Sequence, residues 1–121
     1  MSVDTIHRTP HDTTAATAAT AATELTAAVE AVTAALAALR KDSGSAPVRR
    51  AIEHATATVD ALGPGVTTVV LHRLIASIAD CHRDGVHQSP RLAVCRRSTL
   101  VALRLDPRWA PLATPGQARA S

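Results

Sequence analysis

Apolar residues in the first half of the chain recur at alternating intervals of four and three residues, in two separate sets. Such spacing places the members of each set along one stripe of an α-helix. The sets are Leu25, Val29, Val32, Leu36 and Leu39, and Val48, Ile52, Ala55, Val59 and Leu62. A polar turn at 42–45 separates them, so the pattern predicts an antiparallel hairpin of helices over 14–41 and 46–62.

A third helix is predicted over 66–84, where apolar residues cover more than one stripe and indicate the central, most buried helix of the fold. Gly85 would cap its C-terminus. Its polar face is predicted to contain Thr68, His72, Arg73, Ser77, Asp80 and Arg83.

Ser89 and Pro90 open a fourth helix over 90–105. The segment 99–105 alone could also form a strand, but a lone strand would have no partner, so helix is preferred. Its apolar residues form two stripes. These are Leu92, Cys95, Thr99 and Ala102, and Val94, Val101 and Leu105.

None of the seven prolines interrupts a periodic stretch, which favours an all-α four-helix bundle with a long Ala/Thr-rich first helix and disordered termini. We expect a disordered N-terminus at 1–13, a helical bundle domain at 14–105 and a Pro/Ala-rich C-terminal tail at 106–121, with Trp109 against the bundle. Ala15, Ala18 and Ala22 extend the first stripe backwards. They suggest a docking seam, for which a homodimer is preferred to a monomer, or equally the compositional drift of a GC-rich gene.

Two cysteines make no disulfide framework, and the N-terminus has no apolar signal-peptide region. No apolar run suggests a membrane span. We therefore expect a cytoplasmic protein with no membrane partner. Charge is uneven, with net −2 over 1–62 and net +5 over 63–121, which together give the formal +3. The basic half would suit an acidic partner or a phosphate.

Metal and catalytic chemistry find little support in the spacing of candidate residues. The metal-ligand types in 72–95 form no CxxC, HxxxH or HExxH motif, and Cys81 and His82 diverge by about 100° on a helix. They are His72, Cys81, His82, His87 and Cys95. No nucleophile elbow or glycine-rich phosphate loop is present. We expect no catalytic residues, no cofactor and no metal; His72, Asp80 and His82 are the least implausible polar group for a small helical enzyme.

Four arginines of the predicted fourth helix are the candidate contacts to a partner or to phosphate: Arg91, Arg96, Arg97 and Arg104. Residues 74–97 have a weak likeness to a helix-turn-helix, in which these side chains would face DNA. The turn at 85–89 is longer than that motif usually has, so nucleic acid is a possible partner but not the favoured one. Alternatively, these arginines form an ordinary solvent-exposed face of the helix with no binding partner.

Residues 48–84 resemble small Streptomyces proteins that are named for natural-product biosynthesis and have no assigned reaction. The matching stretches are 49–55 (RRAIEHA), 62–65 (LGPG), Leu74 and Cys81-His82, about a third of the chain. The resemblance implies a short helical protein and transfers no site residue. We expect a small non-enzymatic interaction or accessory protein of an actinobacterial pathway. A DNA-binding regulator is the first alternative and a small helical enzyme the second.

Overall fold

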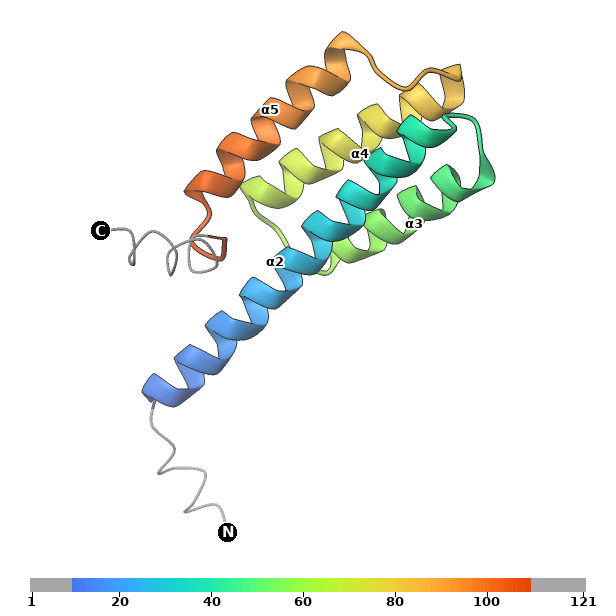
Figure 1. Cartoon of the computed structure of the whole chain (residues 1–121). Helices are drawn as coiled ribbons and strands as arrows, with labels where there is room; N and C mark the ends of the chain where they lie inside the picture. The colour runs from blue at the N-terminus through green and yellow to red at the C-terminus, as the bar shows by residue number, and fades with distance from the viewer. Residues whose placement is uncertain (1–9, 110–121) are drawn as a thin grey trace, which may run out of the picture.

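The computed structural model describes residues 10–109, with side chains from Thr17 onward, and this part of the chain forms four α-helices (Figure 1). They are α2 (Pro10–Lys41), α3 (Ala46–Asp60), α4 (Val66–Asp84) and α5 (Pro90–Leu105). Successive helices run in opposite directions, as short connections require. The predicted all-α four-helix bundle is confirmed, including helix rather than strand over 99–105.

Two helix ends differ from the predicted ones. Helix α2 begins at Pro10 rather than at 14, so 10–13 are helical and not part of a disordered segment. Proline is well suited to a first turn, where its missing N–H costs nothing. Helix α3 ends at Asp60 rather than at 62, shortly before Gly63 takes a left-handed φ of 77°. The disorder predicted for 1–9 and for the last part of the tail, 110–121, falls outside the described residues.

The residues predicted to end α4 and to begin α5, Gly85 and Ser89, act as expected at the two ends of the α4–α5 loop. Gly85 is left-handed, with φ 69°, and the following N–H of Val86 returns to the Cys81 carbonyl over 3.0 Å, which closes α4. The Ser89 hydroxyl oxygen accepts a hydrogen bond from the Leu92 N–H at 3.0 Å and so caps α5. Ser45 precedes α3 but does not cap it, because its hydroxyl donates instead to the Asp42 carbonyl.

The core confirms the two predicted stripes and adds small residues to them. Leu25, Val32 and Leu39 of α2 pack with Val48 and Val59 of α3, all of them buried. Alanines on α2 are equally buried, and they allow the neighbouring helices to approach closely. These are Ala22, Ala28, Ala31 and Ala35. Four predicted stripe members are instead partly buried at the edge of the core: Val29, Leu36, Ile52 and Leu62.

The predicted polar face of α4 is wrong at two positions. Thr68 and Ser77 are buried, and each hydroxyl is satisfied by a nearby carbonyl, that of Gly63 for Thr68 and that of Arg73 for Ser77. The apolar face is also wrong at its start, because Val66 is 75% exposed at the first turn of the helix. Packing of α5 against α4 brings Ser77 inside, and nothing in the described residues covers Val66.

Helix α2 is much longer than its neighbours. Its 32 residues extend about 48 Å, against roughly 22–28 Å for the others. Its N-terminal half therefore projects beyond the bundle (Figure 1), and residues 17–20 are exposed. By length and composition, Thr17–Lys41 could also cross a membrane, a criterion that core helices of soluble proteins meet too. The cytoplasmic location stays a prediction.

The chain returns to the bundle after α5. Asp106 is buried, and its carboxylate accepts hydrogen bonds from the hydroxyl of Thr67 at 2.5 Å and from the guanidinium of Arg108 at 2.7 Å. Trp109 packs against the core, as predicted. The start of the predicted tail, 106–109, is therefore an anchored turn that ties the end of α5 to the start of α4.

Candidate interaction surfaces on helix α5

Helix α5 lies at the edge of the bundle and packs mainly on α4, with little direct contact with α2 or α3 (Figure 1). A helix supported on one side leaves much of its surface open. Its sequence contains four arginines and no acidic residue. Several large apolar side chains are exposed as well: Val94, Leu100, Val101 and Leu105. This helix combines exposed apolar surface with unbalanced positive charge, so it is the candidate site.

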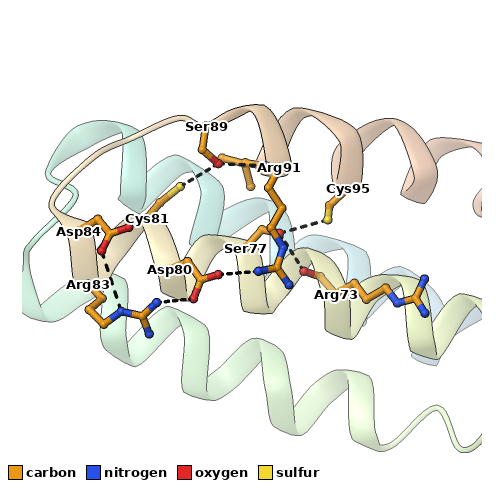
Figure 2. Close-up of polar contacts among 10 residues, drawn as sticks. Arg73, Ser77, Asp80, Cys81, Arg83, Asp84, Ser89, Arg91 and Cys95 are labelled. Carbon is orange, nitrogen blue, oxygen red and sulfur yellow. Dashed lines mark hydrogen bonds and ion pairs between the residues drawn. The ribbon is translucent and has the colours of Figure 1, made fainter.

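The four predicted arginines do not form one surface. The guanidinium of Arg91 lies 2.9 Å from Asp80 of α4, which also pairs with Arg83 at 2.7 Å (Figure 2). The charge of Arg91 is thus compensated within the protein. Arg96 faces the groove towards α2, whereas Arg97 lines the opposite flank of α5. Arg104 follows Arg97 by seven residues, so only these two share a face.

The seam between α4 and α5 contains both cysteines (Figure 2). Ser77 Oγ lies 3.1 Å from Cys95 Sγ, and Cys81 Sγ lies 3.6 Å from Ser89 Oγ. Both thiols are free, and Cys81 is buried. Each cysteine is used to pack α5 on α4, next to a serine hydroxyl. These two polar contacts therefore lie on the α4–α5 seam, one near its middle and one at the start of α5.

The other candidate residues for chemistry lie apart. His72 Nε2 is 2.8 Å from a carboxylate oxygen of Asp60, while His82 Nδ1 is 2.7 Å from the Ser43 carbonyl at the opposite end of α4. Asp80 forms ion pairs with Arg83 and Arg91. The three residues proposed for an enzyme therefore have separate partners, and no group of three or more metal-ligand types lies together within the described residues.

A groove runs between α2 and α5. Its apolar part encloses about 260 Å³ and is lined by both helices and by α4 beneath, including Val29, Leu36, Leu71, Leu100 and Leu103. Its polar part encloses about 550 Å³ near the start of α5 and is lined by residues that include His87, Gln88 and Ser89. Leu36, Arg40 and Arg96 line both parts, so the two form one continuous groove.

Arg40 on α2 and Arg96 on α5 are placed across this groove, and neither forms an ion pair in the described part of the chain. Arg96 is one of the four predicted contact residues, whereas Arg40 was not predicted. The available signal was one edge of the predicted α2 stripe: Val29 and Leu36 each follow a buried alanine, Ala28 and Ala35, and Arg40 lies four residues after Leu36 on the same edge.

The opposite flank of α5 has a shallower hollow of about 430 Å³ against the first turns of α4. We call its five large aliphatic residues the outer patch: Val66, Val70, Val94, Val101 and Leu105. Arg97 lies beside them. The sequence grouped Val94, Val101 and Leu105 correctly as one stripe, but these side chains are exposed rather than buried in the bundle.

No protein-family model, curated protein sequence or solved structure matches this chain. The geometry of α5 and its two flanks is therefore the basis for inferring a function.

Proposed function

We propose that this protein is a small non-enzymatic accessory protein of an actinobacterial pathway, and that it acts by binding a partner protein in the groove between α2 and α5. The observation that supports this most directly is the groove itself. Aliphatic side chains of two helices line it, and Leu100 remains 57% exposed. Exposed apolar surface in a hollow is typical of an interaction site.

An amphipathic helix is the partner element that suits this shape. Such a helix lays its apolar face between two others, with anchors spaced by three and four residues. It would occupy the position beside α5 that α2 leaves open, and would cover Val29, Leu36 and Leu100. Burying apolar area yields roughly 25 cal/mol per Å², so a few well-placed aliphatic anchors supply most of the affinity.

Charge defines the partner further. Arg40 and Arg96 stand at the groove, where no acidic side chain among the described residues pairs with them, and His87 lines its polar end. A partner helix with Asp or Glu beside its apolar face would pair with the two arginines. Rim pairs of this kind add about 0.2–1 kcal/mol each but strongly favour the correct partner and orientation.

The test is site-specific photocrosslinking in the native host. A photoreactive residue at Ala37, which lines the groove, should form an adduct with one protein, and the crosslinked peptide should be an acidic amphipathic helix. The matched control places the same residue at Glu53 on the exposed face of α3. The double variant R40E/R96E should abolish the adduct at 37.

Two results would contradict the proposal. Identical adducts from positions 37 and 53 would mean that capture does not depend on the groove. A crosslinked segment that is neither helical in pattern nor acidic would mean that the groove binds a different element. The melting temperature of R40E/R96E should match that of the parent, since both arginines are exposed, and this separates lost binding from lost folding.

A further inference from the structure

The outer patch lies on the flank of α5 that faces away from the groove. Four of its five members are unusually open for aliphatic residues: Val66 is 75% exposed, Leu105 is 79% exposed, and Val94 and Val101 are each about half exposed, while Val70 is partly buried. Single exposed apolar residues are ordinary, but a contiguous set on two adjacent helices points to a binding surface. The hollow between them is shallow, so the surface is too flat to enclose a helix.

Positive charge borders this patch. Arg97 lines it, Arg104 continues the same side of α5, and Arg73 lies one turn beyond Val70 on α4. No ion pair holds any of these three side chains within the described residues.

The carboxylates on the two helices do not offset this charge. Asp80 is bound by Arg83 and Arg91, and Asp106 is buried against Arg108. Asp84 lies at the far end of α4, 4.0 Å from Arg83. The patch is therefore aliphatic and bordered by uncompensated positive charge.

We propose that the outer patch binds the surface of an anionic phospholipid bilayer. Aliphatic side chains would enter the boundary between headgroups and acyl chains, while the long arginine side chains extend to the phosphates. Attachment of this kind lies on the membrane and needs no spanning helix. This proposal departs from the expectation of no membrane partner. The exposure of Val94, Val101 and Leu105 depends on how α5 packs, so a lipid partner could not be expected from the chain alone.

A second copy of the chain is a poorer occupant. A two-fold contact through this face would bring Arg97 and Arg104 of both copies together with no carboxylate between them, and like charges in contact cost free energy. An anionic bilayer instead supplies many phosphates and an apolar layer on one flat surface, which matches both properties of the patch.

The test is flotation of the full-length protein with vesicles. The protein should float with vesicles of equal parts phosphatidylglycerol and phosphatidylcholine, and not with pure phosphatidylcholine vesicles. Binding should weaken strongly at about 0.5 M salt, where exposed charges are screened. Each arginine near an anionic surface raises the partition coefficient on the order of fivefold. The double variant R97Q/R104Q should therefore lower the partition coefficient about 25-fold.

Two further variants distinguish binding through the outer patch from binding that depends only on the net charge of the protein. V101S/L105S keeps every charge and should also abolish flotation, because both the apolar and the ionic contribution are needed. R49Q/R50Q removes the same charge from exposed positions on α3 and should leave binding within about threefold of the parent.

Absence of flotation with anionic vesicles would overturn the proposal, as would equal loss in R49Q/R50Q and R97Q/R104Q. Loss of an acidic protein partner in V101S/L105S, without any vesicle binding by the parent, would assign the patch to protein docking instead. The groove variant R40Q/R96Q should float normally, so this inference and the proposed function can fail independently. Unchanged melting temperatures confirm that the surface variants fold.

Discussion

The hydroxyl of Thr67 donates a hydrogen bond to Oδ2 of Asp106 over 2.5 Å, across 39 residues of sequence. Thr67 lies in the first turn of α4 and Asp106 directly follows α5, so this contact closes the open end of the α4–α5 pair. The side chain of Arg108 completes the arrangement with two hydrogen bonds to the same carboxylate. Helix α5, which has few contacts elsewhere, is thereby held at its C-terminal end.

Asp106→Asn should lower the free energy of unfolding by about 2 kcal/mol, since hydrogen bonds to a charged group contribute roughly 1.5–3 kcal/mol. The amide keeps the shape but loses the charge that faces Arg108. Chemical denaturation at neutral pH measures the loss. Asp84→Asn is the control: Asp84 is exposed and its contact with Arg83 is 4.0 Å, so its effect should stay within about 0.5 kcal/mol. If Asp106→Asn and Asp84→Asn lowered stability equally, the Asp106 contacts would not stabilise the end of α5.

The same carboxylate predicts a pH dependence. Hydrogen bonding from the side chain of Arg108, followed by that from Thr67, lowers the pKa of Asp106 well below its usual range, against the opposing effect of burial. A lowered folded-state pKa means that this group stabilises the fold above the unfolded pKa of about 3.9 and that the contribution is lost as pH falls further. The stability difference between parent and Asp106→Asn should therefore shrink as pH falls below about 4. A constant difference would contradict this assignment.

Replacing a buried alanine of α2 by a larger residue should lower the stability of the protein. Ala35 is fully buried, and Ala35→Leu should destabilise the protein by about 1–3 kcal/mol through overpacking. The neighbouring Ala34 is exposed, so Ala34→Leu should change stability by less than about 0.5 kcal/mol. Thermal melting of both variants checks the pair. If Ala35→Leu melts like the parent, the close packing of α2 is wrong.

Self-association is expected to use the projecting half of α2, where Ala18 continues the predicted seam and is exposed. Sedimentation at micromolar concentration should give about twice the 12.5 kDa chain mass, and Ala18→Glu should shift the protein to monomer. Ala34→Glu adds the same charge on the packed half of α2 and should leave the dimer intact. A parent protein that sediments only at 12.5 kDa would exclude the dimer.

DNA binding should be weak and limited to Arg97 and Arg104, because Arg91 is paired and Arg96 faces the groove. Two phosphate contacts give a slope of log affinity against log salt of about −1.8. R97A/R104A should remove most of that slope, and R91A should leave it unchanged. Sub-micromolar binding that prefers one duplex sequence would instead make the protein a transcriptional regulator.

The helical architecture could be predicted from the sequence alone. Heptad-like spacing, Gly85 and the Ser89-Pro90 pair act within one or two turns, so their effects follow from local geometry alone. The pairing of Asp80 with Arg83 was predictable for the same reason, since both lie on one helix three residues apart.

Which helix faces are buried could not be predicted from the sequence, because it depends on how the helices pack together. Whether Val94, Val101 and Leu105 are core or surface depends on whether α5 contacts α2, and no local pattern specifies that contact. The partners of two arginines also depend on folding. Arg91 pairs with Asp80 across the α4–α5 loop, and Arg40 lines the same groove as Arg96 although their helices are distant in sequence. Helix formation is local, whereas burial and charge compensation depend on neighbours that the chain brings together only on folding.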